Sequence, residues 1–433
     1  MSANPCARKK LHIAGARVLD PANGIDRTTD VFAARGRIAA VGDAAPDGFA
    51  ADQTIDARGH WVIPGVIDLA ARLREPGQPH KATIASEALA AVSAGITAVC
   101  MPPDTDPVID TPSVIEWIRR RAEPHALRVH PLGALTRDLA GTQISEMIAL
   151  REAGCVGVSN AGRPVRDWGV LRHTMEYAST AGLTVFLHAQ DPALKGQGCA
   201  HEGPVATRLG LAGIPVAAET AALAAGLALA EQTGARLHLC RLSSARAVDM
   251  VAAARARDLA VTADVAAHQL FLSEMDLSGF DSLCHVDPPL RSHHDREALR
   301  EALREGLIDA VCSDHQPHEP DAKINPFPLT EPGLSGLETL LPLGLRLVEE
   351  GLLDAGQLVE RLCASPGRLL GVAGGSLAPG CPADVCILDP KAIWELEPAK
   401  LRSAGKHTPF GGWEFRGSVT HTIVDGAVVF ERG

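Results

Sequence analysis

Eight short apolar runs alternating with helical patterns constrain the fold of this chain more than any other feature. They lie between about residues 60 and 345, and each is apolar on both faces, as strands of a buried parallel sheet are. The runs are WVIPGVIDL (61–69), GITAVCMP (95–102), LRVHPLGAL (127–135), CVGVSN (155–160), LTVFLHA (183–189), RLHLCRL (236–242), LAVTADV (259–265) and IDAVCSD (308–314).

Helical patterns separate most of these runs, and several end in glycine, the residue expected just after a helix C-terminus. Examples are QISEMIALREAG, AAETAALAAGLALAEQTG and REALREALREG. Eight such units predict an α/β fold of the (β/α)8 TIM-barrel type. A doubly wound open sheet is the alternative, and the absence of a GxGxxG motif after the first run argues against it.

Both ends of the chain have a different pattern, with short alternating strands and glycine-containing turns. DVFAARGRIAAVGD near the start and GSVTHTIVDGAVVFERG at the end are examples. We expect the two ends to pair. The predicted organisation is a composite β domain of residues 1–59 and 376–433 beside a TIM-barrel domain of residues 60–375.

Composition excludes several classes of function. The net charge is −11 and no basic face is visible, so neither nucleic acid nor an anionic membrane is an expected partner. The N-terminal MSANPCARKK lacks the apolar region of a secretory signal, and no apolar run is long enough to span a bilayer. Ten scattered cysteines without a CxxC pair suit a reduced, cytoplasmic protein.

Several ordered segments resemble the class I dihydroorotases of the amidohydrolase superfamily. They are PGVIDL (64–69), LREPGQPHKATIASEALAAVSAGITAVCMP (73–102), VDPPLR (286–291), IDAVCSDHQPH (308–318), EPGLSGLETLLP (331–342) and SLAPGCPADVCILDP (376–390). The resemblance covers nearly the whole chain. It implies a TIM barrel with a flanking β domain built from both ends, in agreement with the pattern.

The resemblance also implies a site for one or two zinc ions at the C-terminal ends of the strands, where the metal would activate a water. Two family ligand positions keep a ligand, His188 and Asp314, and we expect both to be vestigial. The other positions have lost theirs: Ala70 and Arg72 of the HxH pair, Asn160 and Ala161 of an acidic motif, and Arg241 of the strand 6 histidine.

Two ligands do not make a zinc site, because a catalytic site has at least three from the protein. We therefore expect no metal cofactor and no catalytic residue. We hypothesise that Arg72, Arg241 or both pair with Asp314 and fill the metal volume. The alternative is that the arginines extend to the mouth and leave a wet pocket. His268 and His315 are possible replacement ligands, whereas Cys240 is expected to point into the helix layer.

The substrate side is altered as well. Arg74 and His318 match family residues that contact the substrate and remain as remnants of that pocket. A family CMPNT motif reads MPPDT here, which places Asp104 where the asparagine would be, and a second substrate asparagine is replaced by Asp287. A carboxylate there would repel an anionic substrate.

Three functions remain open at this stage. The chain most resembles an inactive dihydroorotase-like subunit that supports the assembly of bacterial aspartate carbamoyltransferase. That resemblance implies the carbamoyltransferase catalytic chain as partner, and we expect a homo-oligomer, such as a dimer. The alternative is an active, zinc-dependent cyclic amidohydrolase acting on dihydroorotate, a hydantoin or allantoin. The third is a binding protein that holds a small anion in an arginine-lined pocket.

Overall fold

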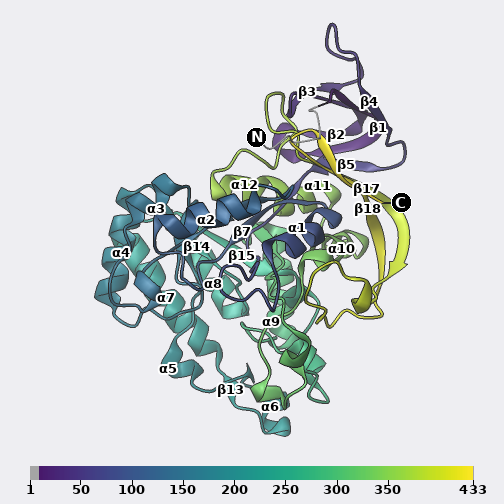
Figure 1. Ribbon diagram of the computed structural model, residues 1–433. Coiled ribbons are helices and arrows are strands. Elements are labelled where there is room, and N and C mark those ends of the chain that lie inside the picture. The colour runs from purple at the N-terminus through teal and green to yellow at the C-terminus, as the bar shows by residue number, and fades with distance from the viewer. Residues whose placement is uncertain (1–8, 433) are drawn as a thin grey trace.

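The computed structural model describes residues 9–432 and shows a TIM barrel flanked by a twisted sheet from both ends of the chain (Figure 1). The eight predicted strand positions are all present. The barrel strands are β6 (Val66–Asp68), β7 (Ile96–Met101), β8 (Arg128–Pro131), β9 (Gly133–Ala134), β10 (Gly157–Ser159), β11 (Thr184–Leu187), β14 (Leu237–Leu239), β15 (Val261–Ala266) and β16 (Ala310–Cys312).

Parallel pairing connects these strands around a common interior. The orders are β6-β7-β8 and β16-β15-β14-β11-β10-β9, and the chain runs from β8 into β9 through the single residue Leu132. A parallel bridge between Ala71 and His315 joins the ends of the first and last strands. The carboxyl ends of the strands therefore meet at one mouth, where barrel sites are built.

Helices cover the outside of the barrel. They are α1 (Ile84–Ser93), α2 (Pro112–Ala122), α3 (Met147–Ala153), α4 (Trp168–Thr180), α7 (Val216–Thr233), α8 (Ala245–Arg255), α9 (His293–Glu305), α10 (Leu337–Glu349), α11 (Ala355–Val359) and α12 (Ser365–Leu370). The predicted glycine ends are confirmed at Gly154, Gly234 and Gly306, each in the left-handed conformation that glycine adopts without a steric penalty.

Two shorter helices and two short strands lie beyond the mouth: α5 (Pro192–Lys195), α6 (Pro204–Leu209), β12 (Ala200–His201) and β13 (Gly213–Ile214). In the described chain, no helix has the length and apolarity to cross a membrane. The cysteines within residues 9–432 are all free, and every one except Cys381 is buried.

Two apolar layers form the core of the barrel. The interior cluster contains Ile67, Leu69, Ala70, Ala98, Cys100, Leu132, Phe186, Cys240, Ala266, Ala310, Cys312 and Leu370. A larger cluster fills the space between the strands and the surrounding helices. Small residues dominate the interior, so the barrel is a packed core up to the polar side chains at its mouth.

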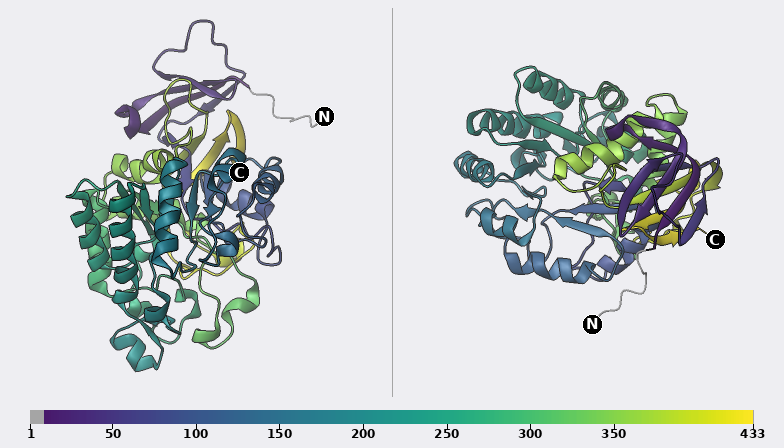
Figure 2. Two further views of the ribbon diagram at one scale, coloured as in Figure 1. Left: turned by 90° about the vertical axis from the view of Figure 1, so that its left-hand side faces the viewer. Right: turned by 90° about the horizontal axis from the view of Figure 1, so that it is seen from above.

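The two ends of the chain form one eight-stranded sheet (Figure 2). Its order is β19-β18-β17-β5-β1-β2-β3, with β4 on β1. The strands are β1 (Leu11–Asp20), β2 (Ile25–Ala34), β3 (Arg37–Gly42), β4 (Gln53–Asp56), β5 (Trp61–Pro64), β17 (Val385–Glu395), β18 (Glu414–Val424) and β19 (Ala427–Glu431).

The structure divides the first predicted strand run into two strands. β5 pairs with β17 and β1 in the terminal sheet, and only β6 belongs to the barrel. Gly65 lies between them, and a Cβ there would come within 2.1 Å of the Thr97 hydroxyl. The terminal sheet thus extends past residue 60 to Pro64, because the chain changes sheets at a position that only glycine fits.

Candidate functional site

A chain of alternating charges occupies the mouth of the barrel, where the metal site was expected. Nε of Arg72 donates to Oδ2 of Asp104 at 2.7 Å, and Nη1 of Arg72 lies 3.6 Å from Oδ1 of Asp314. On the other side, Nε of Arg241 lies 3.4 Å from the same oxygen. Both arginines therefore pair with Asp314, as hypothesised, and neither extends away from it to the solvent at the mouth.

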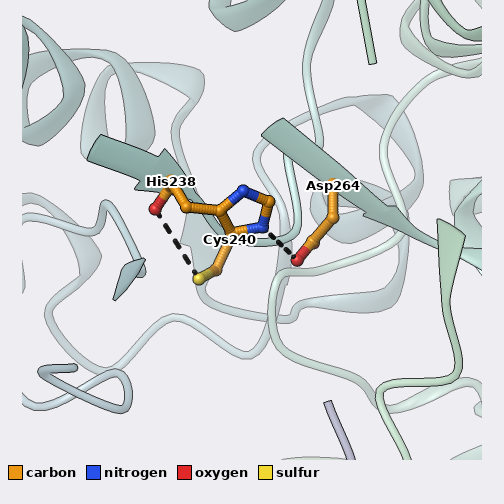
Figure 3. Close-up of side chains that lie close together, drawn as sticks. All are labelled: His238, Cys240 and Asp264. Atoms are coloured by element: carbon orange, nitrogen blue, oxygen red, sulfur yellow. Dashed lines mark hydrogen bonds and ion pairs between the residues drawn. The ribbon is translucent and has the colours of Figure 1, made fainter. Parts of the chain in front are cut away.

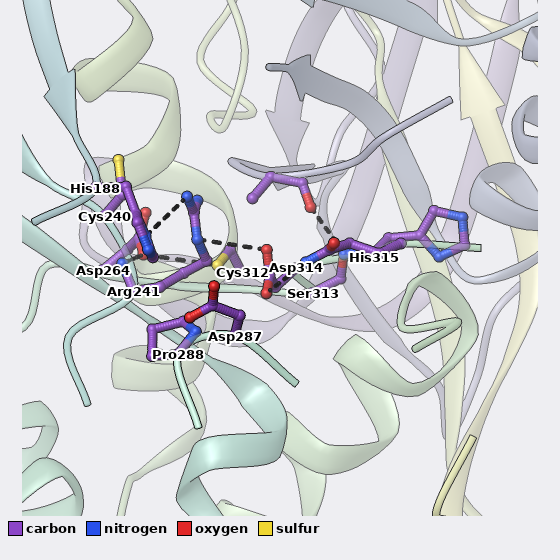
Figure 4. Close-up of polar contacts among 12 residues, drawn as sticks. His188, Cys240, Arg241, Asp264, Asp287, Pro288, Cys312, Ser313, Asp314 and His315 are labelled. Atoms are coloured by element: carbon purple, nitrogen blue, oxygen red, sulfur yellow. Dashed lines mark hydrogen bonds and ion pairs between the residues drawn. The ribbon is translucent and has the colours of Figure 1, made fainter. Parts of the chain in front are cut away.

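Arg241 connects Asp314 to His188 (Figure 4). Nη2 of Arg241 donates to Nδ1 of His188 at 3.4 Å. Burial opposes the charge on Arg241, but Asp314 and the other acidic groups around it, such as Asp264, together outweigh that effect and raise the pKa of the guanidinium. Burial and then the charge of Arg241 lower the pKa of His188 to about 4, so the imidazole is neutral at pH 7.

Left-handed backbone conformations aim these side chains into the lumen. Arg241 has φ 55° and Asp314 has φ 45°, and each follows the last residue of its strand by two positions. Such values are unusual for residues other than glycine. The prediction for Cys240 is wrong for the same reason: the strand ends at Leu239, so simple alternation no longer applies. Cys240 packs in the barrel interior.

The remaining family ligand positions hold no metal donor. Ala70 belongs to the apolar interior, and Ala161 is buried. Asn160 is used structurally: its Oδ1 accepts the backbone N–H of His188 at 2.9 Å, and its Nδ2 donates to the carbonyl of His188 at 3.1 Å. The amide thus holds the strand end that carries His188.

Arg74 and His318, the two remnants of the substrate pocket, contact each other. Nε of Arg74 donates to the carbonyl of Pro317 at 2.9 Å, and its Nη2 lies 3.2 Å from Nε2 of His318. Burial, with the nearby charges of Arg74 and Lys81, lowers the pKa of His318 to about 2. Only about 10 Å³ of cavity remains around Arg72, Arg74 and Asp104, which is the space of a single water molecule.

Asp287 also has an internal partner, which the sequence did not reveal. Nζ of Lys195 pairs with Oδ2 of Asp287, and Nε2 of Gln190 donates to Oδ1 at 2.7 Å. Burial opposes the charge of Asp287, but Lys195, followed by His188 and the hydrogen bond from Gln190, together lower the pKa of this carboxyl to about 2. One signal in the sequence could have revealed these pairs. Carboxylates and cations appear together at positions where the family has neutral or metal-binding residues.

A second polar cluster lies deeper in the barrel and combines His238, Cys240 and Asp264 (Figure 3). Within residues 9–432, it is the one set of three metal-type donors whose ligand atoms come within 4.8 Å of one another. Both ring nitrogens of His238 are already engaged, with Asp264 at 2.9 Å and Thr262 at 2.9 Å. Burial raises the pKa of Cys240, which keeps the thiol protonated. We interpret the cluster as a hydrogen-bonded network.

The donors at the mouth do not fit the zinc site that the family implies. His188 directs Nδ1 at a guanidinium, and Asp314 faces two guanidinium groups. His315 is used elsewhere, with Nε2 at 2.8 Å from Glu87. His268 is buried with no partner for either ring nitrogen, but it does not form a three-donor set with His188 and Asp314 in the described chain. The guanidinium groups of Arg72 and Arg241 thus lie beside Asp314, where the family implies a metal cation.

Comparison with known proteins identifies the relatives of the chain. A family model described as dihydro-orotase-like matches residues 59–247. A dihydroorotase-like protein of Pseudomonas aeruginosa is 48% identical over 422 residues, which are 97% of this chain and 99% of that protein. A dihydroorotase of Geobacter sp. (strain M21) is 43% identical over 426 residues, 98% of this chain and 100% of that protein.

Among solved structures, an L-hydantoinase (dihydropyrimidinase) from Arthrobacter aurescens matches the same fold. It has a TM-score of 0.89 at 26% sequence identity, and the match covers 98% of this chain and 97% of that chain. The amidohydrolase barrel with its terminal sheet therefore extends over the full chain.

Proposed function

Since the chain belongs to the dihydroorotase-like family but carries arginines at its metal site, we propose that it is a catalytically inactive dihydroorotase homologue. It acts as a structural subunit in pyrimidine biosynthesis that supports the assembly of aspartate carbamoyltransferase. The observation that carries this proposal is the pairing of Arg72 and Arg241 with Asp314. Among residues 9–432, it leaves no set of three metal-type donors around Asp314 that would hold a metal to activate a water.

The packing of the mouth supports the same proposal. A catalytic pocket must hold the substrate next to the reacting groups. The cavity of about 10 Å³ beside Arg74 does not hold the ring of a cyclic amide. The anion-binding alternative loses its support as well, because the arginines that would line the pocket already have partners within the chain.

The partner proposed from the resemblance is the catalytic chain of aspartate carbamoyltransferase, in the cytoplasm, with this chain as a homo-oligomer such as a dimer. A barrel that needs neither metal nor substrate is suited to a purely structural role, since function resides in the site and not in the fold. The filled mouth keeps the fold intact without a cofactor.

The first experiment measures the metal content of the protein after growth with zinc, together with its dihydroorotate-hydrolysing activity. We expect less than about 0.1 metal per chain and no activity. The second mixes it with the aspartate carbamoyltransferase catalytic chain of the same organism and follows the complex by size-exclusion chromatography. Separate elution of the two chains, with carbamoyltransferase activity independent of this protein, would contradict the structural role.

The competing candidate is an active, zinc-dependent cyclic amidohydrolase with a reduced metal site. It is favoured by the retained His188 and Asp314 and by the unpartnered ring of His268 close to them. The same metal measurement separates the two candidates. About one zinc per chain with measurable ring hydrolysis would support the enzyme.

A further inference from the structure

A cavity of about 340 Å³ lies between α4 and α7, at the ends of β10 and β11. Figure 1 shows both helices on one side of the barrel, with α5 beyond their ends. Its volume falls within the range of about 300–1,000 Å³ that is typical of small-molecule sites. It shares no lining residue with the small cavity around Arg72 and Arg74, but it adjoins the inherited metal positions through Asn160 and His188, which both line it.

Most of the lining is apolar. Leu171 of α4 and Leu187 of β11 form its floor in the layer between strands and helices, and Ala222 of α7 forms a wall. Trp168, the first residue of α4, lines the cavity while its side chain stays 45% exposed. A half-exposed indole beside an apolar floor offers a face on which a planar ring can stack.

A few polar groups line the same cavity. Arg166 is exposed and forms no ion pair with any residue between 9 and 432. The one carboxylate of the lining, Asp191, accepts the backbone N–H groups of Ala193 and Leu194. Guanidinium groups bind carboxylates through two parallel hydrogen bonds, so this cation is available to an anionic ligand.

His188 also lines the cavity, but its Nδ1 is engaged by Arg241 at the mouth. A guanidinium has only N–H donors, so Nδ1 of His188 must accept the hydrogen bond from Arg241. The cavity thus combines an apolar slot with one exposed cation.

We propose that this cavity binds a small planar aromatic carboxylate, with its ring between Trp168 and Leu187 and its carboxylate at Arg166. This assignment does not depend on the proposed structural role. Of the residues that line the cavity, only His188 contacts the ion pairs at Asp314, through its hydrogen bond with Arg241. It gives the protein a ligand site that adjoins the mouth of the barrel and shares His188 with it.

The test uses indole-3-carboxylate and its neutral analogue indole as probes, in calorimetric titrations of the full chain. We expect one indole-3-carboxylate per chain. Arg166→Gln should weaken its binding about tenfold, which corresponds to about 1.4 kcal/mol, and leave the binding of indole unchanged. Trp168→Ala should weaken both probes. The matched control is Trp117→Ala, which removes a similarly exposed indole of α2 and should leave both affinities unchanged.

Filling the cavity provides the decisive variant. Ala222→Leu should abolish the binding of both probes. If that variant fails to fold, Ala193→Phe tests the same point without changing the core, because Ala193 is an exposed residue of α5 at the rim of the cavity. It should also abolish the binding of both probes. Binding that survives both filling variants would overturn the proposal. So would the absence of binding at about 5 mM of either probe, or an equal effect of Arg166→Gln on the two probes.

Discussion

The mouth of the barrel and the layer directly beneath it contain similar polar residues but are built differently. At the mouth, Arg72 and Arg241 approach one oxygen of Asp314 at 3.6 and 3.4 Å. Neither contact is close enough for a good hydrogen bond. One layer down, His238 and Asp264 are 2.9 Å apart. The lower contacts are thus short hydrogen bonds, whereas the upper ones are longer ion pairs.

The lower layer contains two further close contacts. Nε2 of His315 lies 2.8 Å from Glu87, and Asp68 accepts the backbone N–H of Ser313 at 2.9 Å. The first contact connects the segment after β16 to α1, and the second connects it to β6, so both fix where the mouth residues start. The difference teaches that the support of a barrel site can persist while the chemistry above it is replaced. What the mouth needs is positive charge beside Asp314, and arginine supplies it without a metal.

The largest change is expected from restoring the family donors. In the triple variant Ala70→His, Arg72→His and Arg241→His, three imidazoles join His188 and Asp314, which exceeds the three protein ligands of a catalytic zinc site. We expect the zinc content to rise from less than about 0.1 to about one per chain, measured by mass spectrometry of the metal. Adding Asp314→Ala should lower it again. An equally metal-free triple variant would mean that the lower layer no longer holds the strand ends in the family geometry.

Removal of the central cation is expected to cost the most stability. Arg241→Leu leaves Asp314, which is 2% exposed, without one of its two cations, and breaking a buried pair typically costs about 3–5 kcal/mol. Urea unfolding measures the loss. The matched control is Arg58→Leu, which breaks the exposed pair with Asp56 on the terminal sheet and should leave the midpoint unchanged.

A double variant tests whether the loss comes from the stranded charge. Arg241→Leu combined with Asp314→Leu removes both partners, and we expect it to be more stable than Arg241→Leu alone. If the double variant were the less stable of the two, the cost would come from lost packing around Arg241. The ion pair would then contribute little.

Sequence patterns predicted the barrel because its strands and helices are encoded by apolar residues that recur at short, regular spacings along the chain. They also predicted the partners of Asp314, because the residue types at Arg72 and Arg241 allow few other roles in a lumen. The direction of Cys240 could not be predicted, since it depends on where β14 ends and on the left-handed backbone at Arg241. No local pattern encodes either.

The missed pairs have a different cause. Asp104 contacts a residue 32 positions away, and Asp287 contacts Lys195 at a separation of 92 positions. Such contacts depend on how the loops meet above the strands, and loop geometry is not periodic. The extension of the terminal sheet to Pro64 likewise depends on a close approach of Gly65 to Thr97 that only the folded chain reveals.

A smaller effect is expected from acid. Burial lowers the pKa of His268 and of His285 to about 4 from an ordinary value of 6.5. Between these values the unfolded chain binds more protons than the folded one, so the free energy of unfolding should fall as the pH drops from about 6.5 to about 4. Each histidine contributes on the order of 1–3 kcal/mol to that fall. Urea unfolding of His268→Gln across this range should show a shallower slope, and an unchanged slope would exclude His268 as a source.

The smallest effect is expected at the pair between Lys195 and Asp287, which is partly exposed on both sides. Lys195→Met removes the cation, but Gln190 still donates to Asp287, so we expect a loss of only about 1 kcal/mol in urea unfolding. The pKa of Asp287 is about 2, below its ordinary 3.8, so this stability is present above about pH 4 and disappears as the pH falls towards 2. A loss as large as that of Arg241→Leu would show that the outer pair is as essential as the central one. The buried pair of Arg241 with Asp314 would then contribute no more to stability than the partly exposed pair of Lys195 with Asp287.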